Sequence, residues 1–255
     1  MFWQTANKVA STALTSKALL PIATNPDIVS QNGVDFVVHT INHNLRQKIK
    51  EKHSTENPFL PYQKSMYVAD AGSKHVCLLN RFPVLADHLL ICTKAFAAQN
   101  SPLTQADFSA WLMGIDGGDV FGFYNGGPLA GASQRHRHMQ LVKTRLPLES
   151  LILSGKLPFQ HQLFQFDGGR PENLYRQYQS ALQSLNLFDG TTCAPYNLLV
   201  KNNWMLLLPR TQSNIEHIFL NGINYGGIFL LRNDAQKAWA KEYGFINILR
   251  SCSRS

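Results

Sequence analysis

Apolar residues, many of them β-branched or aromatic, gather in several short segments of the chain between polar residues, which is a pattern typical of strands. Strands are expected at residues 34–41, 74–82 and 88–94. Residues 195–210 hold two apolar runs divided by Asn202-Asn203, a pair that tolerates positive φ. The two runs therefore predict a β-hairpin.

Other segments repeat apolar residues at helical spacing. Thr104 is a good helix cap, and Phe108, Trp111 and Ile115 follow it at intervals of three to four residues. Helices are also expected at residues 1–20, 148–157 and 171–187, and from Asp234 onward. Hairpins beside separate helices favour an α+β fold with a mostly antiparallel sheet.

The chain of 255 residues shows no internal repeat and no linker-like tract. We therefore expect one domain over residues 1–255, with residues 1–30 as an N-terminal helical extension that ends at a turn, Asn25-Pro-Asp27. An amphipathic helix packed on the domain is the simpler interpretation of the first 20 residues, and an organelle-targeting segment is the alternative.

The composition, with 44% hydrophobic residues and no dominant charged block, is that of a globular protein. The apolar runs are shorter than the roughly 18 residues that span a bilayer, so no membrane partner is expected. The four cysteines lie far apart and form no Cys-x-x-Cys pair, which favours a reducing, cytoplasmic location.

A formal charge of +8 indicates an anionic partner. The basic residues are spread along the chain and match no nucleic-acid-binding module, so we expect a small polyanion and no nucleic acid. Lys48, Lys50 and Lys52 form the densest basic stretch. Either all three lysines belong to a solvated basic surface, or one of them reaches a polyphosphate.

The most informative stretch places three glycines before a His-x-His-x-Gln triplet. In extended backbone His136, His138 and Gln140 lie on one side, while Met139 and Leu141 face a core. The preceding glycines let a ligand approach the main chain closely, and amides of residues 126–134 are expected to face a phosphate.

These residue types suit nucleotidyl transfer. A neutral imidazole attacks phosphorus near pH 7, so His138 is the candidate nucleophile, with its tautomer fixed by His136 directly or through the backbone carbonyl. Gln140 donates a hydrogen bond but delivers no proton, so the leaving group must depart as a stable anion such as a polyphosphate. The alternatives are a metal site, for which no supporting ligand pair is present, or surface histidines of an edge strand.

The stretch Phe123-Tyr-Asn-Gly-Gly-Pro, with Gly131-Ala-Ser-Gln134 and the triplet, resembles the signature of the ATP adenylyltransferases, or diadenosine tetraphosphate phosphorylases, in the transferase branch of the histidine-triad superfamily. The likeness extends in the same order to residues 57–61, 78–82, 88–90, 196–199 and 204–210. Galactose-phosphate uridylyltransferase shares the triplet but is similar over less of the chain.

The resemblance implies a histidine-triad-like, mostly antiparallel sheet flanked by helices, and a two-step reaction on a dinucleoside polyphosphate. His138 takes an adenylyl group and ATP is released; inorganic phosphate then accepts the group to give ADP. No covalent cofactor is implied, and Mg²⁺ is expected only as a companion of the polyphosphate. A related enzyme with another donor, such as adenosine phosphosulfate or a nucleotide sugar, and a non-catalytic nucleotide-binding regulator are the alternatives.

The resemblance also assigns binding residues. The phosphates would be held by Asn125, Gly131, Ala132, Ser133, Gln134 and Gln140, and the nucleotide would lie along Asn80, Arg81, Asn197 and Met205, with Lys48 the best of the three lysines. Without the resemblance, Asn80 and Arg81 are equally explained as a buried amide and a surface cation. Two departures from the family pattern are present. Arg135 stands where the family usually has proline, and the connection between residues 160 and 195 is short compared with the fungal enzymes.

Overall fold

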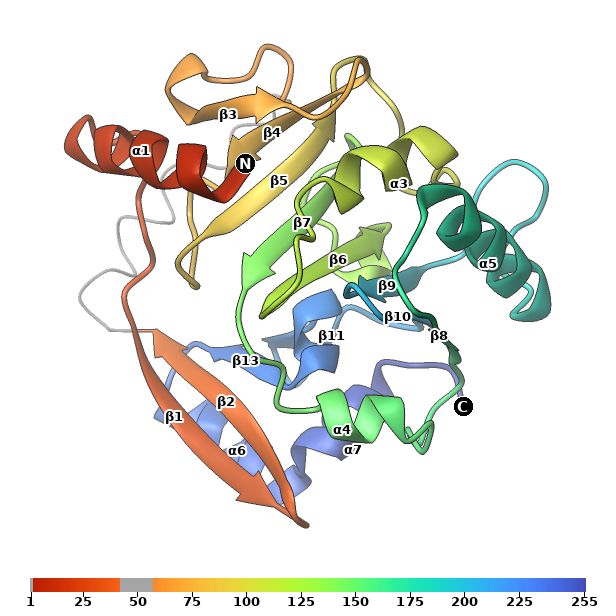
Figure 1. Ribbon diagram of the computed structural model, residues 1–255. Helices are drawn as coiled ribbons and strands as arrows, with labels where there is room; N and C mark the ends of the chain where they lie inside the picture. Colours follow the sequence, from red (N-terminus) through yellow and green to blue (C-terminus); the bar gives the residue numbers. More distant parts are fainter. Residues whose placement is uncertain (1, 42–56) are drawn as a thin grey trace.

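The computed structural model describes residues 2–41 and 57–255, and its largest element is an eight-stranded sheet in the order β3-β4-β5-β7-β6-β9-β10-β8 (Figure 1). Every neighbouring pair in it is antiparallel. Its strands are β3 (Tyr67–Asp70), β4 (His75–Leu79), β5 (His88–Thr93), β6 (Val120–Gly126), β7 (His138–Lys143), β8 (Gln162–Gln165), β9 (Tyr196–Val200) and β10 (Trp204–Pro209). The expected α+β fold and the hairpin at Asn202-Asn203 are confirmed.

One face of this sheet is covered by helices. Side chains of α1 (Phe2–Thr15), α3 (Gln105–Leu112) and α5 (Pro171–Ser184) form one apolar cluster with alternate residues of the strands. Figure 1 shows α1 over β3 and β4, and α3 beside α5. The expected amphipathic character of α5 is confirmed, since Leu174, Tyr178 and Leu182 are buried in this cluster.

The opposite face carries two separate apolar clusters. The larger one joins β6, β9 and β10 to the smaller sheet and to α4 (Glu149–Leu153), α6 (Asp234–Tyr243) and α7 (Phe245–Ser251). The smaller one joins β4 and β5 to Phe59. β7 contributes Met139 and Leu141 to the helix-covered face, which leaves its alternate side chains on this one.

The smaller sheet has the order β1-β2-β13, with β1 (Thr24–Gln31), β2 (Val34–Ile41) and β13 (Ile228–Leu231). The prediction that residues 1–30 are helical is therefore wrong beyond Thr15. Pro26, which was expected in a turn, lies in β1 and pairs with His39 of β2. Proline is tolerated there because β1 is an edge strand, where a missing N–H costs no ladder bond.

Helix starts follow from their caps. Thr104 and Asp107 cap each other at the start of α3, with Asp107 Oδ2 accepting from the Thr104 amide at 2.6 Å. Asn233 caps α6 by accepting from the Gln236 amide at 2.8 Å. The remaining short elements are η2 (Lys64–Met66), η3 (Pro128–Ala130), β11 (Asn214–Ile215), β12 (Ile218–Phe219) and η4 (Gly222–Gly226).

A bilayer-spanning helix, which has to be both long and apolar, is absent from residues 2–41 and 57–255.

Candidate active site

The His-x-His-x-Gln triplet lies where β7 begins. His138 and Gln140 project from the face opposite to Met139 and Leu141, as strand alternation predicts, and His136 forms an isolated bridge with Ala98 just before the strand. His138 is 4% exposed and packs 5.3 Å from the ring of Phe59. The polar side chains thus sit between the two apolar clusters of that face.

The proton on the His138 ring is located by one contact. Its Nδ1 lies 2.9 Å from the carbonyl oxygen of His136, and because a carbonyl only accepts, Nδ1 carries the hydrogen. Burial lowers the pKa of His138 to about 4, so the ring is neutral at pH 7. The remaining nitrogen, Nε2, then holds a free lone pair.

His136 is held by protein groups at both ring nitrogens. Its Nε2 donates to the carbonyl oxygen of Thr93 at 2.8 Å, and its Nδ1 accepts from the Asn57 amide at 2.9 Å. Burial lowers the pKa of His136 as well. A metal ion would have to displace one of these bonds in order to bind this ring.

Gln140 is oriented by a chain of hydrogen bonds. The Asn80 side-chain amide lies 3.0 Å from Nδ1 of His88, and Nε2 of His88 lies 2.9 Å from Oε1 of Gln140. Oε1 only accepts, so His88 donates to it and accepts from Asn80. This direction turns the Gln140 NH₂ group away from His88. Burial lowers the pKa of His88 to about 4, which keeps that ring neutral.

The glycine-rich loop leaves β6 at Gly126 and is folded onto itself. Gly127 and Gly131 have φ of +103° and +92°, conformations that glycine adopts without strain. The amides of Gly127, Ala130, Gly131 and Ala132 donate to carbonyls inside the loop or to the end of β6. The amides of Gly131 and Ala132, which were expected to face a phosphate, therefore have carbonyl partners inside the loop in this structure. Ser133 is exposed and Gln134 is half-buried.

Asn125 and Asn197 meet beneath this loop. The Asn197 amide donates to Asn125 Oδ1 at 2.8 Å and to the Ala130 carbonyl at 2.9 Å, while its oxygen accepts from Arg210 at 2.5 Å. Asn197 is 0% exposed and Asn125 2%. Through these bonds the Asn197 side chain connects the glycine-rich loop to β9. Its predicted contact with a nucleotide stays a prediction.

Three other predicted residues have different outcomes. The Met205 side chain belongs to the apolar cluster on the helix-covered face, so it points away from the face that carries His138 and Gln140. Arg81 is exposed beside Phe82, with its guanidinium carbon 5.4 Å from the ring centroid. Lys48, together with Lys50 and Lys52, falls outside the described residues.

Several residues outside the predicted site contact the triplet. Gln99 is 3% exposed and contacts the main chain of His138, and Phe59 packs on both imidazoles. Arg137 points to the opposite side and pairs with Asp107 at 2.8 Å. Despite burial, hydrogen bonding to His75 and the charge of Arg137 keep the pKa of Asp107 below its usual value. Phe59 and Gln99 come from connecting segments whose path the sequence pattern does not predict.

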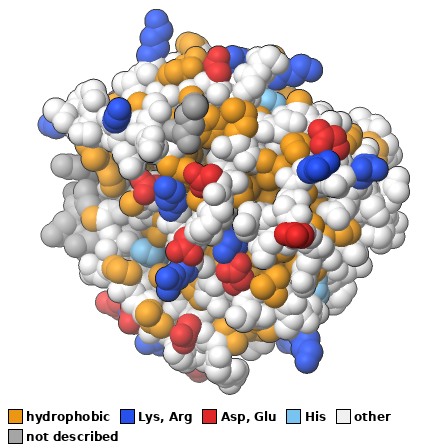
Figure 2. Space-filling model, in the orientation of Figure 1, with side chains coloured by type: hydrophobic (Ala, Val, Ile, Leu, Met, Phe, Trp, Pro, Cys, Tyr) orange, Lys and Arg blue, Asp and Glu red, His pale blue; other side chains and the backbone are white. Residues whose placement is uncertain are grey.

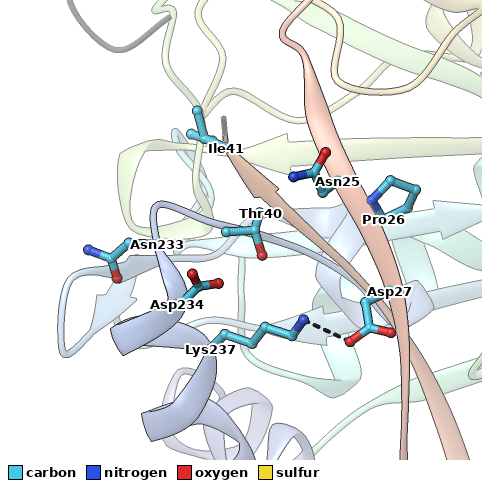
Figure 3. A pocket seen from close by; sticks show the side chains of 8 residues that line it. All are labelled: Asn25, Pro26, Asp27, Thr40, Ile41, Asn233, Asp234 and Lys237. Carbon is cyan, nitrogen blue, oxygen red and sulfur yellow. Dashed lines mark ion pairs between the residues drawn. The ribbon is translucent and has the colours of Figure 1, made fainter. Parts of the chain in front are cut away.

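A cavity of about 380 Å³ lies between the start of β1, the end of β2 and the start of α6, and no residue of the triplet lines it (Figure 3). Asp27 pairs there with Lys237 at 2.7 Å, and Asp234 adds a further carboxylate. With two carboxylates and one ammonium in its lining, this cavity repels rather than attracts a polyphosphate.

Comparison with known proteins agrees with this geometry. Residues 1–164 match the family model described as the Ap4A phosphorylase N-terminal domain, and residues 155–255 match the ATP adenylyltransferase C-terminal domain. The chain is 28% identical to the diadenosine 5',5'''-P1,P4-tetraphosphate phosphorylase 2 of Saccharomyces cerevisiae, covering 70% of this chain and 69% of that protein. It is 30% identical to Protein APA1 of the same yeast, over 62% of this chain and 61% of the relative.

The fold is that of a solved structure, the yeast Ap4A phosphorylase Apa2, with a TM-score of 0.83, 20% identity, and 99% of this chain and 97% of that chain covered. The same yeast protein has been solved in complex with Ap4A, with a TM-score of 0.82. The two family models together cover every strand of the eight-stranded sheet. The chain therefore belongs to the family of Ap4A phosphorylases with an ATP adenylyltransferase C-terminal domain.

Proposed function

We propose that this protein phosphorolyses diadenosine tetraphosphate to ATP and ADP through an adenylyl group carried on His138. The observation that supports it best is the neutral His138 ring, with its proton held on Nδ1 by the His136 carbonyl and its Nε2 unprotonated. One yeast relative is named diadenosine 5',5'''-P1,P4-tetraphosphate phosphorylase 2, and the yeast Ap4A phosphorylase Apa2 was solved with Ap4A bound.

In the first step the Nε2 lone pair attacks the α-phosphorus of one adenosine. A P–N bond forms, the P–O bond to the rest of the molecule breaks, and its electron pair leaves on ATP. The ring becomes positively charged, and the bond from Nδ1–H to the His136 carbonyl then strengthens. No proton is delivered to ATP, because a terminal phosphate has its second pKa at about 6 and departs as an anion.

In the second step an oxygen of inorganic phosphate attacks the same phosphorus. The P–N bond breaks, its electron pair returns to Nε2, and ADP is released. The Gln140 NH₂ group, aimed by His88, donates to a non-bridging oxygen in both steps. Ser133 and Gln134 add polar groups at the loop, and Mg²⁺ is expected to arrive with the polyphosphate rather than on a protein ligand set.

A small polyanion fits the surface better than nucleic acid does. On the face in Figure 2, lysine and arginine side chains are scattered among acidic ones and form no continuous basic stripe. The four cysteines are free and buried, which is consistent with a cytoplasmic protein.

The test exposes the wild-type protein briefly to diadenosine tetraphosphate without phosphate and searches for AMP on His138 by mass spectrometry. The adduct is expected on wild type only, and His138→Ala is expected to lose at least about 10³-fold in kcat. His161→Ala, a histidine whose Nδ1 contacts the Phe159 carbonyl away from the triplet, is the control and should keep kcat.

Other donors are distinguished by products. With adenosine phosphosulfate or a nucleotide sugar as the natural donor, phosphate-dependent ADP formation from diadenosine tetraphosphate would be slow while the other donor turned over fast. A protein that binds the dinucleotide but never forms the adduct would be a regulator. Near-normal cleavage by His138→Ala would remove His138 as the nucleophile.

A further inference from the structure

The two strands that carry the triplet and the glycine loop separate at His138. β6 and β7 pair from Val120 with Lys143 to Phe123 with Gln140. If this register continued, Asn125 would lie opposite His138. The side-chain amide of Gln99 occupies the space between them instead.

Gln99 bonds to both strands. Its Nε2 donates to the carbonyl oxygen of Asn125 at 2.9 Å and to that of His138 at 3.2 Å. Its Oε1 accepts from the His138 amide N–H at 2.9 Å. In an antiparallel ladder the N–H and C=O of one residue point to the same neighbour, so a single side chain replaces the missing partner of His138 on its β6 side.

The amide of Gln99 has only one workable orientation. Its oxygen must face the N–H and its nitrogen must face the two carbonyls, because a rotated amide would set oxygen against oxygen. The Gln99 main chain is fixed as well, since its N–H donates to the Arg135 carbonyl at 2.8 Å and its carbonyl accepts from the Tyr124 hydroxyl. Gln99 is 3% exposed, so water cannot readily take over these bonds.

We propose that Gln99 is a positioning residue for the nucleophile: it fixes the main chain of His138, and with it the direction of the Nε2 lone pair. Neighbouring strands normally lie about 4.7 to 4.9 Å apart. The inserted amide keeps β6 farther from β7 at this point, so that the glycine loop and the imidazole stand on two sides of a gap. The kinetic part of the proposal rests on the proposed function, and the structural part does not.

The kinetic test uses Gln99→Leu in the full chain, with phosphate-dependent cleavage of diadenosine tetraphosphate as the readout. We expect kcat to fall at least about tenfold, since a displacement of 1 Å at reacting atoms can cost about 10²-fold, while KM changes less than about threefold. The matched control is Gln31→Leu. Gln31 likewise accepts from one main-chain N–H, of Phe245, and donates to one carbonyl, of Lys241, but on the β1 side of the molecule (Figure 1). It should lower stability and leave kcat unchanged.

A second readout needs no turnover. Nitrogen-15 NMR of the wild-type imidazole should show His138 protonated on Nδ1, and its main-chain amide should exchange slowly with solvent. In Gln99→Leu the ring signals should shift towards a mixture of tautomers, because the Nδ1 contact to His136 depends on the main-chain position. Gln31→Leu should leave them in place. If Gln99→Leu does not fold, Gln99→Glu, which keeps the length and the acceptor and loses both donors, is measured in its place.

The outcomes separate the two proposals. Unchanged kcat and unchanged His138 signals in a folded Gln99 variant would refute the positioning role, and so would fast exchange of the His138 amide in wild type. If wild type fails to cleave the dinucleotide but the His138 signals still respond to Gln99→Leu, the proposed function is wrong while the structural role of Gln99 stands.

Discussion

At the scale of single residues, individual hydrogen bonds set the proton position on His138 and the orientation of the Gln140 amide. The His136 carbonyl fixes the proton of His138 on Nδ1, and Nε2 of His88 fixes the amide of Gln140 with its oxygen inward. A glutamine amide carries a donor and an acceptor at similar positions, so its usefulness to an anionic ligand depends entirely on which way it is turned. His88 is the residue that turns it.

His88→Phe tests this orientation. Phenylalanine keeps the ring shape but cannot donate to Gln140, so the amide is free to turn its oxygen towards the phosphate. We expect kcat to fall by about 10- to 100-fold, somewhat less than for Gln140→Leu, because loss of a transition-state donor costs about 10² to 10³. Kinetics of phosphate-dependent cleavage measure both, with His161→Phe as the aromatic control. Equal kcat for His88→Phe and wild type would mean that Gln140 is held by other contacts.

The glycine loop shows how an element is shaped by close packing. A Cβ on Gly131 would lie 2.6 Å from Cβ of Asn221, in a residue whose φ of +92° already disfavours a side chain. Gly131→Ala should lower the free energy of unfolding and also reduce kcat, because the loop that is proposed to border the site must move away from Asn221. Gly168→Ala is the matched control: φ is +74° there, and nothing lies within 4 Å of the added Cβ.

Both variants carry a cost of about 1 to 2 kcal/mol from positive φ alone. The steric contact at Gly131 should add about 1 to 3 kcal/mol, the usual cost of overpacking. Urea denaturation measures the difference between the two. Equal destabilisation would show that the loop accommodates the methyl group without strain.

Strand alternation was enough to predict which side chains of the triplet share a face, because that depends only on local backbone. It was not enough for Met205, whose face depends on the register of β10 against β9, where Met205 pairs with Val200 and Asn197 with Leu208. Gln99 could not be predicted at all. Its role arises from a gap between β6 and β7, which exists only after distant segments pack together.

At the scale of the whole molecule, the eight-stranded sheet contains strands from both segments that match a family model, residues 1–164 and residues 155–255. β6, from the first, pairs with β9, from the second, through five residue pairs from Gly122 with Val200 to Gly126 with Tyr196. A boundary between the segments would cut through this ladder and the apolar cluster above it. We propose that the chain folds as a single cooperative unit, so that one free energy of unfolding describes it.

That free energy should depend on pH through the buried histidines. Burial lowers the pKa of both His88 and His138 from 6.5 to about 4, so between these values the unfolded chain binds protons that the folded protein does not. Stability should be fully present above pH 6.5 and should fall by about 1.4 kcal/mol per pH unit for each histidine as pH drops towards 4. His136 acts in the same direction, since burial lowers its pKa too.

Urea denaturation at pH 5, 6 and 7 measures this slope. The carboxylates with lowered pKa, such as Asp107, lose their contribution only below their ordinary value of 3.8, so they do not obscure the window. His88→Phe removes one of the rings with a lowered pKa and should reduce the slope by the contribution of that ring, whatever its effect on kcat. A free energy of unfolding that stays level from pH 7 to pH 5 would mean that the folded protein takes up these protons. The His138 ring would then be charged below its ordinary pKa of 6.5, and the proposed nucleophile would be mostly neutral only above that pH.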